Sequence, residues 1–240
     1  MANLFIVPTP IGNMGDITLR ALDVLKNVPV ILSEDTRVTK KLLSALKIDY
    51  KNKKILNYFE HNERDKLDDV LDILAGGYDV ALVSDAGTPL INDPGFPLVR
   101  MIRELKKDVN VVVLPGASAV LCALAASGLP TDRFTFLGYV PRKPNDKKKM
   151  LKAAKRASEN IKCTYIAFET KHRLESTLLM MKLILGGSTQ LSVCKELTKV
   201  HESVEYGTVQ DAVDKISAIS ADDLKGEYVL VFYKDSPFTP

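Results

Sequence analysis

The sequence predicts an α/β protein built from two α/β domains, and two features of the chain support this fold class. Short β-branched runs alternate with helical stretches over roughly the first half of the 240 residues. Such alternation is typical of a largely parallel sheet covered by helices on both faces. After Leu129-Pro130 the later strand-like runs lie closer together, which indicates a mixed sheet with hairpin-like pairs. We therefore expect an N-terminal domain over residues 1–116 and a C-terminal domain over residues 117–240.

The strands expected in the first domain are short apolar runs, namely Leu4–Val7, Val30–Leu32, Val80–Val83 and Val111–Leu114. Helical spacing occurs between them, over Thr18–Lys26, Thr36–Leu46, Asp65–Ala75 and Phe96–Leu105. The third helix carries an amphipathic i, i+3, i+4, i+7 stripe formed by Leu67, Val70, Leu71 and Leu74. The apolar stretch Val111–Leu129 is broken by Pro115 and Gly116, so we expect a strand and a helix there, and no membrane span.

The second domain is expected to hold five strands, at Phe134–Leu137, Thr164–Phe168, Leu191–Cys194, Val204–Thr208 and Tyr228–Phe232. Its expected helices are Lys147–Ser158, His172–Ile184 and Val209–Ile219.

Composition places the chain among ordinary globular proteins, with 46% apolar and 26% charged residues. The net charge of +3 argues neither for nor against a nucleic-acid partner. Three cysteines without C-x-x-C spacing, and only three histidines, predict reduced thiols and no metal site. The first residues lead directly into an apolar strand, unlike a signal peptide. We therefore expect a cytoplasmic protein that does not bind a membrane.

One segment is strongly basic. Residues 141–156 contain eight basic residues and one acidic residue. Such a run can be a solvated helix face, or an edge that contacts the phosphates of a polyanion. The residues proposed for the second role are Arg142, Lys143, Lys147, Lys148 and Lys149.

Three loops rich in glycine and proline follow predicted strands: PTPIGN (8–13), SDAGTPLINDPG (84–95) and PGASA (115–119). All three lie at carboxyl ends of parallel strands, the edge where open α/β sheets bind ligands. Each could be a simple turn, but three at one edge favour a pocket. Walker-type, G-x-G-x-x-G and G-x-S-x-G motifs are absent from the sequence. The residues alone therefore predict an α/β enzyme with a pocket of unusual type.

Several motifs together resemble the ribosomal RNA methyltransferases of the tetrapyrrole methylase superfamily. Besides the three loops, these motifs are SEDTR, EHNE, GYVPRK, FETKHRL, KELTKVHE and KGEYVLVF, in this order along the chain. The resemblance implies two α/β domains, S-adenosylmethionine in the cleft between them, and a homodimer. It also implies 2′-O-methylation of a cytidine ribose in 16S rRNA of the small ribosomal subunit.

The resemblance carries a set of cofactor contacts onto the matching positions. In the three glycine- and proline-rich loops these are Ile11, Asp85, Gly87, Thr88, Ile91, Ser118 and Ala119. In the second domain they are Phe168, Leu197 and Glu227, each of which could also be a core or strand residue. Relatives commonly have Ser-Pro where this chain has Thr170-Lys171, so we expect a different loop shape there.

No catalytic base is assigned by the sequence. The candidates are Asp35, Asp85, Lys143 and Glu169. Structural interpretations compete with these: an Asp35–Arg37 ion pair at a helix start, turn chemistry for Asp85, and a Glu169–Arg173 pair. Two other functions stay open, a methylase of corrin or diphthamide precursors and a non-catalytic RNA-binding assembly protein.

Overall fold

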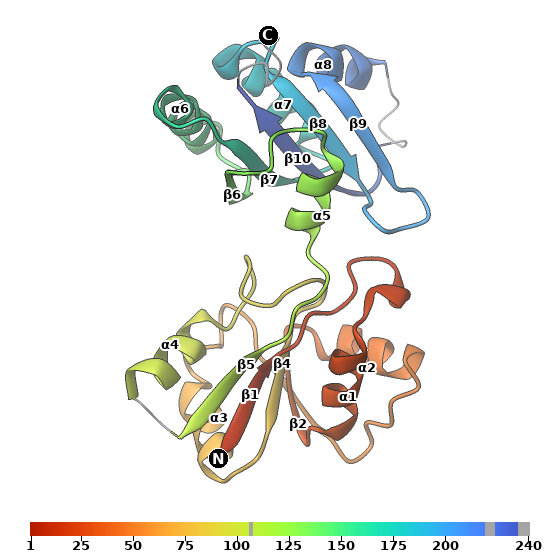
Figure 1. Ribbon diagram of the computed structural model, residues 1–240, viewed down its shortest axis with the longest axis vertical. Coiled ribbons are helices and arrows are strands. Elements are labelled where there is room, and N and C mark those ends of the chain that lie inside the picture. Colours follow the sequence, from red (N-terminus) through yellow and green to blue (C-terminus); the bar gives the residue numbers. More distant parts are fainter. Residues whose placement is uncertain (106–107, 219–223, 235–240) are drawn as a thin grey trace. The chain divides into compact units, whose positions relative to one another are not determined.

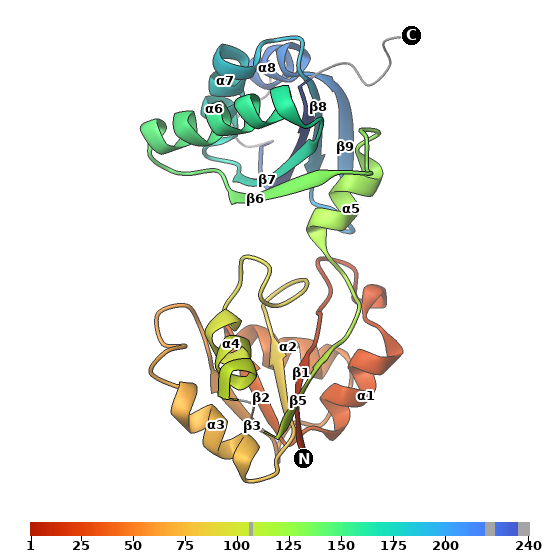
Figure 2. The same cartoon turned by 60° about the vertical axis from the view of Figure 1, so that its left-hand side comes forward.

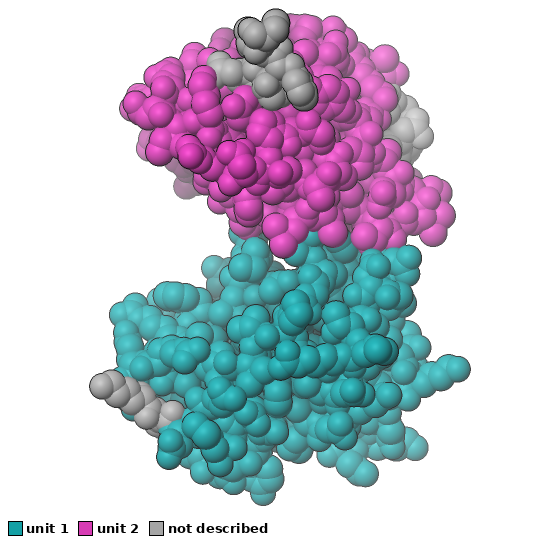
Figure 3. Space-filling model, in the orientation of Figure 1, with its two compact units in different colours: residues 1–118 teal, residues 119–240 magenta. Residues whose placement is uncertain are grey.

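The computed structural model describes residues 1–105, 108–218 and 224–234. Its internal contacts divide the chain into two compact units, Met1–Ser118 and Ala119–Pro240, which Figure 3 colours separately. The boundary expected from the sequence, between residues 116 and 117, lies slightly before this division. We describe each unit by itself.

Unit 1 (Met1–Ser118) contains a five-stranded, fully parallel sheet, as predicted (Figure 1). The strand order is β3-β2-β4-β1-β5. The bounds are Ala2–Ile6 for β1, Val30–Ser33 for β2, Lys54–Asn57 for β3, Val80–Val83 for β4 and Val109–Val113 for β5. Strand β3 was not predicted, because this edge strand has only two apolar residues, Ile55 and Leu56, and neither is fully buried.

Helices cover both faces of this sheet, as expected from the alternating pattern (Figures 1 and 2). The helices are α1 (Leu19–Asn27), α2 (Thr36–Ala45), α3 (Leu67–Ala75) and α4 (Phe96–Leu105), with a short 3₁₀ helix η1 at Met14–Asp16. On one face, Leu25 of α1 and Leu43 of α2 share a core with Ile31. On the other face, Leu71 of α3 and Leu98 of α4 share a core with Leu82. Burial of both faces explains why every residue of β2 and β4 is buried.

Unit 2 (Ala119–Pro240) contains a mixed five-stranded sheet, which confirms the second prediction. The order is β6-β7-β10-β8-β9; β6 and β7 are parallel and the other pairs are antiparallel. The bounds are Phe134–Tyr139 for β6, Thr164–Thr170 for β7, Gln190–Lys195 for β8, Ser203–Thr208 for β9 and Glu227–Tyr233 for β10.

Three helices of unit 2, α6 (Pro144–Asn160), α7 (Leu174–Leu185) and α8 (Val209–Ser217), share one core with the sheet (Figure 2). A fourth helix, α5 (Ala119–Ala126), contacts β10 and lies close to Cys194 on the opposite face. Helix α6 begins three residues before its expected start, because Pro144 occupies the first turn, where a missing N–H costs nothing. The expected end of α8, Ile219, lies outside the described residues.

Candidate functional site

The three glycine- and proline-rich loops lie at one edge of the unit 1 sheet. They follow β1, β4 and β5, and these strands are neighbours in the order β4-β1-β5. Thr9 and Gly87 exchange backbone hydrogen bonds of 2.9 and 3.0 Å, which join the first loop to the second. The Thr88 hydroxyl donates to the Ala117 carbonyl at 2.9 Å, which joins the second loop to the third. The loops therefore form one connected structure.

Glycine is required at two points where these loops approach one another. Gly87 has φ +85°, and a Cβ there would lie 3.3 Å from the Cγ2 atom of Ile11. A Cβ on Gly116 would lie 2.5 Å from the Cβ of Pro8, closer than atoms can approach without a shift. The small residues of the motifs thus permit the contact between loops.

The second loop also holds non-glycine residues in the left-handed region. Leu90 and Asn92 have φ values of 72° and 69°, and they flank Ile91, whose side chain is 47% exposed. Such conformations cost about 1–3 kcal/mol each and concentrate at ligand-binding sites. The backbone at this point therefore presents an apolar side chain to solvent at an energetic cost.

The seven expected cofactor contacts of the three loops differ in exposure. Asp85 and Ile91 are exposed, Thr88, Ser118 and Ala119 are half-buried, and Ile11 and Gly87 are buried within the loop structure. The buried pair forms the contact between the first and second loops, so these two residues shape the edge and the other five offer atoms at its surface.

Carboxylates that follow strands β2 and β4 meet beside the second loop. The backbone N–H of Asp35 donates to Asp85 Oδ1 at 3.1 Å, and the N–H of Asp85 donates to Glu34 Oε2 at 3.4 Å. Partial loss of solvent raises the pKa of Glu34 and of Asp85, and the neighbouring carboxylates raise both further. Burial raises the pKa of Asp93 to about 6, with Glu34 and Asp85 contributing repulsion. The loop edge therefore favours a cationic ligand.

Asp35 forms the ion pair with Arg37 at the start of a helix that was the structural alternative to a catalytic role. It caps α2 by accepting from the Arg37 N–H at 2.8 Å, and its carboxylate pairs with the Arg37 guanidinium at 2.6 Å. Hydrogen bonds from Arg37 lower the pKa of Asp35 to about 2. A carboxylate of so low a pKa is a weak proton acceptor at neutral pH.

The three expected cofactor residues of unit 2 lie at one end of its sheet. Phe168 is near the end of β7, Glu227 begins the antiparallel β10, and Leu197 follows β8. Glu227 is exposed and pairs with Lys199 at 2.8 Å, whereas Leu197 is only 8% exposed. The structure thus brings the three positions together within unit 2.

Glu169 is fully buried in a network of charged and polar groups. Its Oε2 atom lies 2.8 Å from the Arg173 guanidinium, and Thr177 donates to its Oε1 atom at 2.5 Å. Arg173 Nε donates to Thr170 Oγ1 at 3.1 Å. Thr170, one of the two residues that differ from the Ser-Pro of relatives, is therefore a partner in this network. The Glu169–Arg173 pair considered from the sequence is therefore present. The Glu169 side chain has zero exposure, which argues against it as a base for a bound substrate.

The expectation that Lys147 contacts RNA has to be corrected. Lys147 is 4% exposed, and its ammonium donates to Thr177 Oγ1 at 2.7 Å and to Ser176 Oγ at 3.1 Å. Desolvation lowers the pKa of this lysine. Helical spacing in the sequence could have indicated this burial, because Lys147 shares its face of α6 with the buried Leu151 and Ala154. The other four expected contacts, Arg142, Lys143, Lys148 and Lys149, are exposed.

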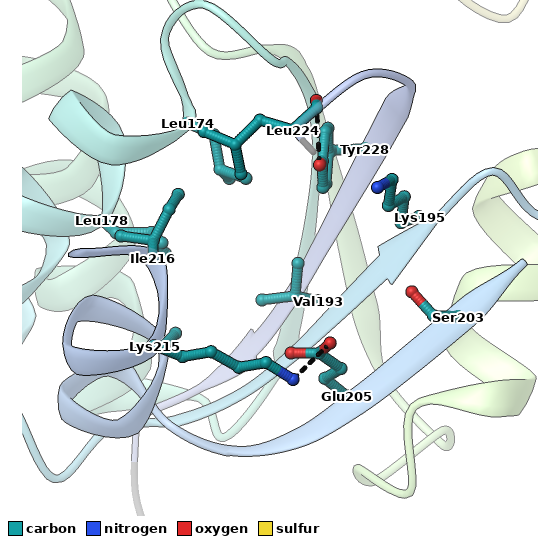
Figure 4. Close-up of a pocket in the computed structure, with 11 residues that line it drawn as sticks. Leu174, Leu178, Val193, Lys195, Ser203, Glu205, Lys215, Ile216, Leu224 and Tyr228 are labelled. Carbon is teal, nitrogen blue, oxygen red and sulfur yellow. Dashed lines mark hydrogen bonds and ion pairs between the residues drawn. The ribbon is translucent and has the colours of Figure 1, made fainter. Parts of the chain in front are cut away.

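A pocket of about 110 Å³ lies elsewhere in unit 2 (Figure 4). Its walls are mainly apolar, including Leu174, Leu178, Ile216 and Tyr228. The ion pair between Lys215 and Glu205, 2.7 Å long, lies beside it. None of the expected site residues lines this pocket, so we assign it no role in the candidate site.

Over the ranges 1–105, 108–218 and 224–234, no helix has the length and hydropathy of a membrane span. The same ranges hold no group of three or more side chains suited to binding a metal ion.

Sequence comparison relates the chain to methylases over most of its length. The family model described as tetrapyrrole (corrin/porphyrin) methylases matches residues 3–213. Ribosomal RNA small subunit methyltransferase I of Vibrio cholerae is 45% identical over 238 residues, covering 97% of this chain and 78% of that relative. The protein of the same name from Mycoplasmopsis pulmonis is 40% identical, covering 97% of this chain and 98% of that relative.

Solved structures with low sequence identity share the fold. The methyltransferase CobJ has a TM-score of 0.68 at 16% identity, covering 97% of this chain and 94% of its own. The cobalt precorrin-4 methyltransferase CbiF has a TM-score of 0.65 at 18% identity, with coverage of 96% and 94%. A diphthine synthase has a TM-score of 0.66 at 15% identity, with coverage of 97% and 90%. At such identities these neighbours support the architecture alone.

Proposed function

We infer that this chain, which belongs to the tetrapyrrole (corrin/porphyrin) methylase family, is an S-adenosylmethionine-dependent methyltransferase that acts on ribosomal RNA of the small subunit. The supporting observation is the connected loop edge of unit 1, in a chain whose relatives at 40–45% identity bear the name ribosomal RNA small subunit methyltransferase I. We propose that it works in the cytoplasm, where ribosomes are assembled, and as a homodimer, as the family resemblance implies.

The chemistry of the loop edge suits S-adenosylmethionine. This cofactor carries a sulfonium and an ammonium against one carboxylate, so it is a net cation, and the carboxylates of Glu34 and Asp85 complement it. The apolar side chain of Ile91 and the small residues Ser118 and Ala119 suit contact with its hydrocarbon parts. We propose Ile11, Asp85, Gly87, Thr88, Ile91, Ser118 and Ala119 as its binding residues, with Phe168, Leu197 and Glu227 of unit 2. That the cofactor binds between the two domains stays a prediction.

The finer proposal is transfer to a ribose 2′-hydroxyl of a cytidine in 16S rRNA. When bound, the cofactor supplies the methyl group and the leaving group. The chain's own residues must hold the hydroxyl near the methyl group and accept its proton. Burial of Glu169 and the low pKa of Asp35 leave Asp85 as the candidate for this proton transfer, because Lys143 is assigned to the RNA phosphates.

The exposed basic residues of unit 2 support an RNA substrate. Arg142 and Lys143 precede α6, while Lys148 and Lys149 project from its first turns. Cationic side chains bind a polyanion by releasing its counterions. A corrin-sized small molecule gives no comparable reason for such a surface, so we favour rRNA over a tetrapyrrole precursor.

The test is methyl transfer from radiolabelled S-adenosylmethionine to small ribosomal subunits taken from cells that lack this protein. We expect label in 16S rRNA, and mapping of alkali-resistant linkages should locate one ribose-methylated cytidine. Label on a tetrapyrrole precursor in place of the subunits would replace the substrate. Cofactor binding, measured by calorimetry, without transfer to any of these would favour a non-catalytic assembly protein.

A further inference from the structure

Strand β6 contains a bulge that changes the direction of Tyr139. Phe136 of β6 pairs with Ile166 of β7, whereas Tyr139 pairs with Phe168, so one extra residue is inserted on β6. Gly138, within the insertion, has φ +70°. Side chains of a strand alternate between faces, and the extra residue returns Tyr139 to the face that holds Phe136 and Phe168. Bulges are rare in parallel pairs and often redirect a side chain near an active site.

The redirected ring is braced by two others. The ring centroids of Tyr139 and Phe168 are 5.3 Å apart at an interplanar angle of 64°, and those of Phe136 and Phe168 are 4.9 Å apart at 63°. Phe136 and Phe168 are half-buried, but Tyr139 is 52% exposed. The outer member of this aromatic cluster therefore presents ring surface to solvent while its partners hold it in place.

The chain after Tyr139 is fixed by the buried charged network. The N–H of Val140 donates to the Phe168 carbonyl at 3.0 Å, and Arg173 donates to the Val140 carbonyl at 2.7 Å. Arg173 is held in turn by the buried Glu169. Within three residues of this anchor stand the exposed cations Arg142 and Lys143. An exposed ring and two cations are thus carried by one ordered segment.

We propose that Tyr139 is a stacking platform for an unpaired base of the RNA substrate, with Arg142 and Lys143 contacting the adjoining phosphates. This inference rests on the proposed function and adds the form of RNA that is recognised. Proteins that bind single-stranded RNA combine aromatic side chains, on which bases stack, with cations along the backbone. Paired bases of a duplex are already stacked and do not offer a face to such a ring. The occupant is therefore a single-stranded segment.

The experiment measures binding of a fluorescein-labelled oligocytidylate of about ten nucleotides by anisotropy. We expect Tyr139→Ala to weaken binding by about tenfold or more, the loss typical of one stacked base. Tyr139→Phe keeps the ring and should bind within about twofold of the original chain. Tyr78→Ala is the matched control, because Tyr78 is 59% exposed and precedes β4 at the opposite edge from the unit 1 loops. An unlabelled RNA duplex of equal length should compete poorly.

Cofactor affinity and methyl transfer to subunits separate the possible outcomes. The proposal requires Tyr139→Ala to raise the KM for subunits while calorimetry finds S-adenosylmethionine affinity unchanged. Four results overturn it: no binding of the oligocytidylate by the original chain, no loss in Tyr139→Ala, equal loss in Tyr139→Phe, or an equal loss of cofactor affinity. Failure of the original chain to methylate subunits would instead reject the proposed function, whatever Tyr139 does.

Discussion

At the scale of single residues, burial separates two lysines that look alike in the sequence. Lys147 and Lys148 are neighbours in one basic run, yet Lys147 donates to Thr177 and Ser176 inside unit 2 and Lys148 is exposed. Charge counting cannot make this distinction, because it ignores which side of a helix each residue occupies. The apolar residues Leu151 and Ala154, one and two turns later, define the inward side.

We predict that Lys147→Met lowers the stability of the protein and Lys148→Met does not. Methionine keeps the packing of the aliphatic stem but removes the hydrogen bonds that the ammonium donates. A hydrogen bond to a charged group contributes about 1.5–3 kcal/mol to stability. Thermal unfolding should show a lower Tm for Lys147→Met, by about 2–4 °C for each 1 kcal/mol lost. Equal Tm values for the two variants would contradict the assignment of Lys147 to the interior.

Asp93 predicts a pH dependence of stability. Its pKa of about 6 in the folded chain exceeds the ordinary value of 3.8, so folding favours the protonated form. The stabilisation is complete below pH 3.8 and is lost as pH rises through about 6. Above that pH, the ionised side chain is repelled by Glu34 and Asp85.

Asp93→Asn should therefore raise the Tm at pH 7.5, by about 2–4 °C if about 1 kcal/mol is recovered. The difference from the original chain should shrink as the pH falls from about 6 towards 3.8. Scanning calorimetry between pH 4 and 8 measures it. The exposed Asp23 of α1 gives a control, Asp23→Asn, for the loss of a carboxylate elsewhere. A Tm difference that is constant across this range would refute the role given to Asp93.

At the scale of elements, apolar periodicity predicted most strands and helices, and hydrogen bonding across the sheet accounts for what it missed. Strands β2 and β4 are buried on both faces, so their sequences are continuous apolar runs. Strand β3 has one buried neighbour and polar ends, and its pairing with β2 decides its conformation. Strand β6 was expected to end at Leu137, but the structure continues it through a bulge at Gly138 to Tyr139.

The candidate site was predictable to a similar extent. Loop positions after parallel strands predicted one shared edge, and the hydrogen bonds between the loops are consistent with it. The sequence could not show that Asp35 is held by Arg37 or that Glu169 is enclosed, since both depend on side-chain partners and burial. Those contacts, and not residue type, reduced the list of candidate bases.

Gly87 tests the loop edge with an unusually close control. Gly87 and Gly77 both have φ +85°, but a Cβ on Gly77 would meet nothing within 4 Å, whereas one on Gly87 would press on Ile11. Both Gly→Ala changes should cost about 1–2 kcal/mol from the left-handed backbone. Only Gly87→Ala should weaken S-adenosylmethionine binding, by about tenfold, or about 1.4 kcal/mol. Calorimetry of both variants measures this, and equal cofactor affinities would reject a binding role for the loop.

At the scale of the whole molecule, the charges are unevenly distributed along the chain. Residues 141–156 carry a net charge of +7, whereas the whole chain carries +3. The rest of the chain therefore carries a net charge of −4. The carboxylates of Glu34, Asp85 and Asp93 gather at the loop edge of unit 1, and the exposed cations gather around the start of α6 in unit 2. This distribution matches a cationic cofactor and an anionic substrate that bind to different residues.

Separate binding residues predict separate responses to salt. RNA affinity should fall as salt rises, with a log–log slope that changes by about 0.7 for each single-strand phosphate contact removed. Lys148→Gln with Lys149→Gln should therefore flatten the slope by about 1.4, while S-adenosylmethionine affinity stays the same. Lys40→Gln with Lys41→Gln removes the same charge from exposed neighbours on α2 and should leave the slope unchanged. If both pairs flatten the slope equally, the attraction comes from total charge and the basic segment has no special part in holding RNA.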